Sequence, residues 1–179
     1  ASLELTSNLE NTLISSNIND LNKDLETNLE TTILISDMTK PTYYVENKKF
    51  KTFIDEDNNG YFAFGSLFND DLDKIEDQNG FYIFLHLKEL NVDSFSFNNQ
   101  KENNSNLRSI KLKVDELNFF DNIYFSQNFE INLLHNETVA SFSGKNLNGS
   151  IRIDSTDFIR VDVFDTKFDF QGVDTFNQY

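Results

Sequence analysis

Apolar residues recur at every second position along most of the chain after residue 42. The clearest run is Phe81–Leu90, in which Phe81, Ile83, Leu85 and Leu87 share one parity and Tyr82, Phe84, His86 and Lys88 share the other. Clusters of Asn, Asp, Ser and Gly separate the runs, and these residues favour turns. Short runs with period two and turn signals between them predict an all-β protein built on an antiparallel sheet.

The first forty residues have a mixed pattern. The stretches Leu3–Ser7 and Thr31–Ser36 alternate or are β-branched, so each predicts a strand. Between them, Leu21, Leu25 and Leu29 keep a four-residue spacing that is compatible with an amphipathic helix. We expect residues 1–40 to form strand, irregular segment and strand, with a short helical segment between residues 17 and 30.

One alternating stretch is repeated. The sequence LHLKELNV at Leu85–Val92 returns as LKVDELNF at Leu112–Phe119, with apolar positions and the Glu-Leu-Asn triplet in register. A looser copy, IRVDVFDT, begins at Ile159. The repeat predicts strands that present the same parity to the same surface, with the polar breaks Lys88–Leu90 and Asp115–Leu117 at the rim of that surface.

The composition of the chain disfavours some classes of function. The 179 residues suffice for a single domain over 1–179, and the apolar mass is concentrated in 19 Phe and 6 Tyr. The formal net charge of −15 disfavours binding to nucleic acid, which needs clustered Lys and Arg, and direct adhesion to an anionic membrane surface. The chain has no Cys, and no apolar run approaches the length of about 20 residues that a membrane-spanning helix needs.

Candidate sites for chemistry are weak. Asp55–Gly60 matches the start of a calcium loop, but the position that should carry a bidentate Glu is Ser66, so a polar hairpin turn is the better interpretation. His86 and His135 are the only histidines and lack a metal-ligand spacing. No distinctive carboxylate pair indicates a glycosidase. We expect a protein that is not an enzyme and that uses no metal or cofactor.

The alternation of apolar and polar residues is compatible with two kinds of structure. In a β-sandwich, each strand buries one face against a second sheet. In a curved sheet that forms an open groove, acyl chains cover the apolar face, and each buried CH₂ contributes about 0.8 kcal/mol. The first kind describes a binding or assembly module of the cell envelope, similar to a surface lipoprotein, and the second describes a lipid carrier.

The order of motifs resembles the C-terminal part of the YhdP branch of the AsmA-like proteins. In that family, a strand ending in Ser-Asp-Leu-x-Gly leads into a loop with a lysine, and this chain has LELTSNLENTLISSNINDLNK, in which Lys23 matches that lysine. Asn19, Leu21 and nearby residues stand where the family has prolines and glycines.

Later family elements follow in the same order. An alternating strand with a Leu-Asp-Leu-Asp-like ending is matched by FLHLKELNVDSF from Phe84. A Val-Asp-Leu-x-Val-x-x-Leu-x-Leu strand is matched by SIKLKVDELNFF from Ser109. A Gly-x-Leu-x-Leu strand and a closing strand are matched by NGSIRI from Asn148 and IRVDVFDTKF from Ile159. The resemblance spans nearly the whole chain and consists mainly of motif order and alternation.

The resemblance implies a role in outer-membrane biogenesis. Members of this family are long β-structures anchored in the inner membrane, and they are thought to move phospholipid across the periplasm of Gram-negative bacteria along a hydrophobic groove. This chain would be a segment of such a protein, with the rest of the envelope-spanning chain and the membrane anchor outside it, and phospholipid acyl chains as ligands. Alternation and family pattern together predict these groove residues: Phe81, Ile83, Leu85, Leu87, Ile110, Leu112, Val114, Phe129, Ile131, Leu133, Ile151, Ile153, Ile159, Val161 and Val163.

Overall fold

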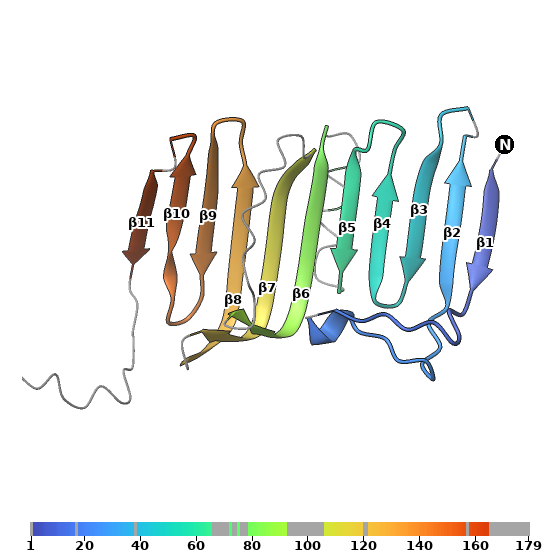
Figure 1. Cartoon of the computed structure of the whole chain (residues 1–179), viewed down its shortest axis with the longest axis horizontal. Helices are drawn as coiled ribbons and strands as arrows, with labels where there is room; N and C mark the ends of the chain where they lie inside the picture. The colour runs from blue at the N-terminus through green and yellow to red at the C-terminus, as the bar shows by residue number, and fades with distance from the viewer. Residues whose placement is uncertain are drawn as a thin grey trace, which may run out of the picture.

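A computed structural model describes residues 2–16, 18–37, 39–65, 72, 75, 79–92, 106–119, 122–156 and 158–164. Within these residues, eleven strands form one sheet whose spatial order is the chain order (Figure 1). The strands are β1 (Leu3–Ser7), β2 (Thr31–Ser36), β3 (Thr42–Asn47), β4 (Phe50–Ile54), β5 (Gly60–Phe64), β6 (Phe81–Asn91), β7 (Leu107–Phe119), β8 (Asn122–Leu133), β9 (Glu137–Ser143), β10 (Asn148–Asp154) and β11 (Ile159–Phe164). The predicted all-β fold is confirmed.

Most neighbouring strands are antiparallel, as the alternation predicted. Two pairs are the exception, because β6 runs parallel to β5 on one side and to β7 on the other. Parallel neighbours cannot be joined by a tight hairpin and need a crossover connection. The β5–β6 and β6–β7 connections are therefore crossovers, which alternation along the chain did not indicate.

The parallel pair β6–β7 explains the sequence repeat. Leu85 lies beside Leu112, Leu87 beside Val114, and the Glu-Leu-Asn triplets lie beside each other in register. Paired residues of neighbouring parallel strands point to the same side of the sheet. The repeat therefore places equivalent residues of β6 and β7 side by side. The described residues of the looser third copy form β11, which is an edge strand of the sheet and does not contact the β6–β7 pair.

The polar breaks of the repeat are the site of a bend. Strand pairing skips Lys88, Asp115 and Ser126, which lie at corresponding points of β6, β7 and β8. Ser126 has a positive φ of 53°. Val114 and Leu117, three residues apart, pack in one cluster, although such residues face opposite sides of a regular strand. The lower ends of these strands therefore fold over (Figure 1), and the breaks lie at a corner of the sheet and not at its rim.

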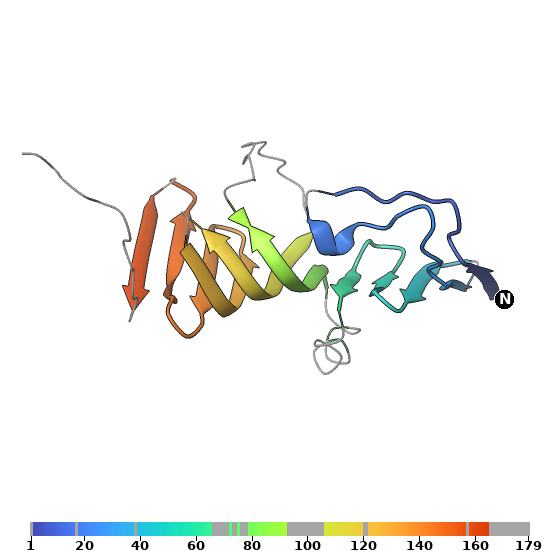
Figure 2. The same ribbon diagram turned by 90° about the horizontal axis from the view of Figure 1, so that it is seen from below.

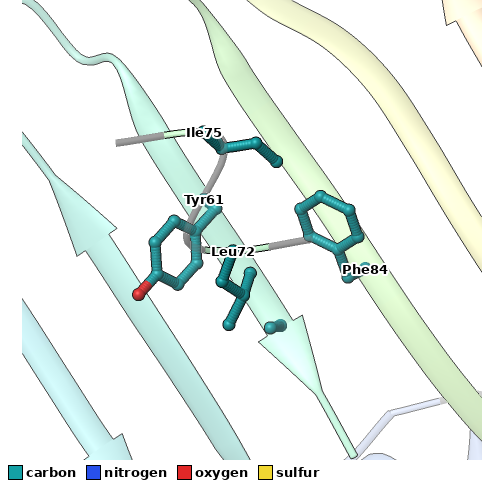
Figure 3. Close-up of a cluster of buried hydrophobic side chains, with 5 residues drawn as sticks. Tyr61, Leu72, Ile75 and Phe84 are labelled. Atoms are coloured by element: carbon teal, nitrogen blue, oxygen red, sulfur yellow. The ribbon is translucent and has the colours of Figure 1, made fainter. Parts of the chain in front are cut away.

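Two hydrophobic clusters support the sheet. The corner cluster contains Val114, Leu117, Tyr124 and Leu147 and lies inside the bend. The second cluster joins Phe84, Tyr61 and Ala63 of β5 and β6 to Leu72 and Ile75 (Figure 3). Each cluster covers only a few strands, so most of the sheet has no second layer among the described residues.

The irregular stretch between β1 and β2 borders one end of the sheet. It comprises residues 8–16 and 18–30, hereafter the border segment, and contains a single 3₁₀ turn, η1 (Asn19–Leu21). The predicted order of strand, irregular segment and strand is confirmed, and Leu21, Leu25 and Leu29 do not form the amphipathic helix. Figure 2 shows the border segment on the side of the sheet toward which the end of β6 bends.

The predicted polar turns are also confirmed. Asp55 Oδ1 accepts hydrogen bonds from the N–H groups of Asp57 and Asn59 in the turn between β4 and β5. Burial acts to raise the pKa of Asp55, but the hydrogen bonds from Asn59 and Asp57 outweigh it and lower that pKa below its usual value. Gly60 follows with φ of +144°, and a Cβ there would lie 1.9 Å from the carbonyl oxygen of Phe53. Glycine is thus required where β5 begins.

Candidate lipid-binding face

One face of the sheet is apolar from edge to edge. Directly paired residues of neighbouring strands point to the same side, so the pairing defines rows that cross the sheet. The central row carries, from β1 to β11, Leu5, Ile33, Val45, Thr52, Phe62, Ile83, Ile110, Ile131, Ala140, Ile151 and Val161. Thr52 is the single polar member of this row.

A parallel row, hereafter the border row, lies on the same face nearer the border segment. In its second half it carries Phe64, Leu85, Leu112, Phe129, Phe142, Gly149 and Val163. In its first half it begins with Ser7, Thr31 and Asn47, which are polar. We call the surface formed by these rows and their same-parity neighbours the apolar face.

All the predicted groove residues lie on the apolar face. Pairing places the predicted residues of β6, β7, β8, β10 and β11 in register with one another. Their exposure differs along the sheet: those of β11 are largely exposed, most of the others are half-buried, and Leu87 and Val114 are buried. Leu87 and Val114 therefore serve the packing of the corner, and the half-buried Leu112 and Phe129 pack against the corner cluster. The other predicted residues offer apolar surface.

The opposite face of the sheet carries a largely polar row. A row in register with Lys111 carries Thr32, Glu46, Lys51, Glu130, Ser141, Ser150 and Asp162. Its apolar members, Ala63 and Phe84, are the ones that Leu72 and Ile75 cover. The next row on this face is apolar or aromatic from β2 to β6, where it carries Leu34, Tyr44, Phe53, Tyr61 and Tyr82, and mostly polar from β7 to β11, where it carries Ser109, Asn132, Val139, Arg152 and Arg160. The opposite face is therefore mixed in the first half of the sheet and largely polar in the second half.

The border segment is held in place by polar contacts. Lys23 is buried, and its ammonium donates hydrogen bonds to the carbonyls of Thr12 and Asp24 at 2.8 and 2.9 Å. Asp20 Oδ2 accepts a hydrogen bond from the N–H of Lys88 on β6. Lys49, in the turn between β3 and β4, donates to the carbonyls of Asn22 and Asp20. These bonds fix a border along one end of the apolar face.

Sequence reasoning missed this border and a polar residue inside the corner. Gln127 follows Leu87 and Val114 in the same row and is fully buried. Its Nε2 donates to the carbonyl of Phe125, and its Oε1 has no hydrogen-bond partner. Only the departure from alternation around Ser126 marks this site in the sequence.

The two histidines lie at different places in the fold. His86 Nε2 lies 3.1 Å from Asp115 Oδ1 on the polar side of the sheet, and His135 is exposed in the turn after β8. Within the described ranges, no group of three or more His, Cys, Asp or Glu side chains could hold a metal ion. Ser66 lies outside the described residues. No helix in the described part of the chain is long and apolar enough to cross a membrane.

Comparison of the chain with models of protein families, with curated proteins and with solved structures found no match.

Proposed function

We propose that the chain is a non-enzymatic lipid-binding segment whose apolar face carries phospholipid acyl chains across the periplasm between the inner and outer membranes. The observation that supports this function is the central row, which runs from β1 to β11 with Thr52 as its only polar residue. Such a continuous apolar surface on a protein marks a binding site for an apolar partner.

The dimensions of the face suit a lipid. Neighbouring strands lie about 4.8 Å apart, so a row across eleven strands is about 50 Å long. Each acyl CH₂ that leaves water on this surface contributes about 0.8 kcal/mol. The central row provides this energy at every strand except β4, where Thr52 stands, so a bound acyl chain gains little by stopping at one strand.

The ends of the strip favour transfer over storage. Leu3 and Leu5 of β1 and Val161 and Val163 of β11 are exposed at the two edges of the sheet. Among the described residues, an acyl chain on the central row thus meets no polar residue at either edge of the sheet. Under this proposal, further segments of a longer envelope-spanning chain continue the strip, and membrane anchoring belongs to those segments.

The alternative function is that of a β-sandwich module for binding or assembly in the cell envelope. It needs a second sheet that seals the apolar side chains. All eleven strands of the described part of the chain lie in a single sheet. An assembly module would therefore have to cover the apolar face with another protein.

Lipid extraction from the purified protein tests the proposal. We expect mass spectrometry of the organic extract to show phospholipid with the wild-type chain. Ile151→Asp should reduce the phospholipid per protein at least about fivefold, because an unpaired carboxylate on the apolar face opposes acyl contact.

Ser150→Asp is the matched control, since Ser150 is the preceding residue of β10, is also half-buried, and faces the polar side. It should leave the lipid content unchanged, with circular dichroism confirming that both variants are folded. Absence of phospholipid from the wild-type extract, or equal lipid content in the two variants, would argue against lipid carriage.

A further inference from the structure

The sheet has a notch where β5 ends. β5 stops at Phe64, whereas its parallel neighbour β6 continues to Asn91. Gly65 leaves the sheet there with φ of +86°, and a Cβ at this position would lie 2.9 Å from the Cβ of His86. A hollow of about 380 Å³ opens at this point, and its lining residues are Asp20, Lys48, Lys49, Phe64, Gly65, His86, Lys88 and Asp115.

The hollow is rich in cations for so acidic a chain. Three lysines and two aspartates line it, in a protein whose formal net charge is −15. Asp115 faces His86 at 3.1 Å, and Asp20 accepts the backbone N–H of Lys88. Both carboxylates therefore already have hydrogen-bond partners other than a lysine ammonium.

Two of the lysines are free to bind an anion. The Lys49 ammonium donates to backbone carbonyls of the border segment. By contrast, neither the Lys48 nor the Lys88 side chain forms an ion pair or hydrogen bond with any described residue. Both are exposed, so an incoming anion meets ammonium groups that need not break an existing pair.

The hollow adjoins the apolar face. Phe64 lines the hollow and is also a member of the border row, beside Leu85. Lys48 directly follows Asn47, which is paired with Thr31 in the polar first half of the same row. His86 and Asp115 lie on the polar side of the sheet, so the hollow opens at the end of the sheet where the two faces meet, and its cationic groups lie at the margin of the surface on which acyl chains would rest.

We infer that this hollow binds the phosphate group of a phospholipid whose acyl chains lie on the apolar face. The inference depends on the proposed function for the acyl part and adds a headgroup site with Lys48 and Lys88 as the contacts. An ammonium and a phosphate oxygen form a charge-assisted hydrogen bond, which is stronger than a neutral one. Phosphate-bearing lipids are therefore favoured over neutral lipids with the same acyl chains.

Calorimetric titration of the full chain with three probes tests this site. The probes are dihexanoyl phosphatidic acid, dihexanoylglycerol, which has the same acyl chains without phosphate, and inorganic phosphate. We expect the wild type to bind phosphatidic acid about tenfold more tightly than dihexanoylglycerol, with the difference falling as salt increases. Lys48→Gln combined with Lys88→Gln should remove this difference and leave the affinity for dihexanoylglycerol unchanged.

A second double variant, Lys40→Gln with Lys145→Gln, removes the same charge at two exposed sites outside the hollow and should retain the preference. Equal affinity of the wild type for phosphatidic acid and dihexanoylglycerol would overturn the headgroup site while leaving acyl binding intact. Inorganic phosphate binding as tightly as phosphatidic acid would instead show an anion site independent of lipid. Binding of neither lipid would refute the proposed function itself.

Discussion

Replacing Val114 with aspartate is expected to lower the free energy of unfolding by at least about 4 kcal/mol. Val114 is 0% exposed and packs with Leu117, Tyr124 and Leu147 inside the bend of the sheet. A carboxylate there would lose its hydration without a cation to pair with. Urea denaturation followed by circular dichroism measures the change.

Val161→Asp makes the same substitution on the same face in a different environment. Val161 is 54% exposed on the edge strand β11. Its replacement should change the free energy of unfolding by less than about 1 kcal/mol, as for most exposed substitutions. If the two variants lost similar stability, the corner would not be a packed core.

Phe84→Ala is the second substitution with a large expected effect. Phe84 is 2% exposed and is covered by Leu72 and Ile75 on the polar side of the sheet (Figure 3). Truncating a buried phenylalanine removes its transfer free energy and leaves a cavity, which costs about 3–5 kcal/mol. The ammonium of Lys111, 5.9 Å from the ring centroid, would also lose its contact with the ring.

Phe125→Ala serves as the control, because Phe125 is 52% exposed on β8. We expect this variant to unfold within about 1 kcal/mol of the wild type in the same urea titration. The account of the second cluster fails if truncation of Phe84 is as mild as truncation of Phe125.

The parity of the strands could be derived from the sequence because burial imposes it directly. Alternation placed Ile110, Leu112 and Val114 on one side of a strand and Lys111 and Lys113 on the other, and the structure has this arrangement. Each such assignment depends only on neighbours along the chain. The all-β class and the main turns follow from the same local information.

The direction and bending of the strands could not be derived in this way. Parallel pairing of β6 with β7 depends on the path between them, which is not encoded in alternation. The repeat of Glu-Leu-Asn was the available signal, since equivalent strands side by side favour like residues in register. The bend depends on Lys88, Asp115 and Ser126 interrupting pairing at the same level in three strands.

The border segment and the hollow beside it arise from contacts that are distant in sequence. The Lys49 ammonium reaches Asn22, and Asp20 reaches Lys88. The resemblance to the AsmA-like family singled out Lys23, which is buried and ties the border segment together. β1 and β2 extend the sheet, and the described residues between them border it.

The central claim is that lipid lies on one face of the sheet, and site-specific photo-crosslinking in cells tests it most directly. A photoreactive residue would replace Leu112, Ile131 or Ile151 on the apolar face, or the adjacent Lys113, Asn132 or Arg152 on the polar face. The account predicts phospholipid adducts at the first three positions and background levels at the other three. Equal capture on both faces, or capture on neither, would contradict it.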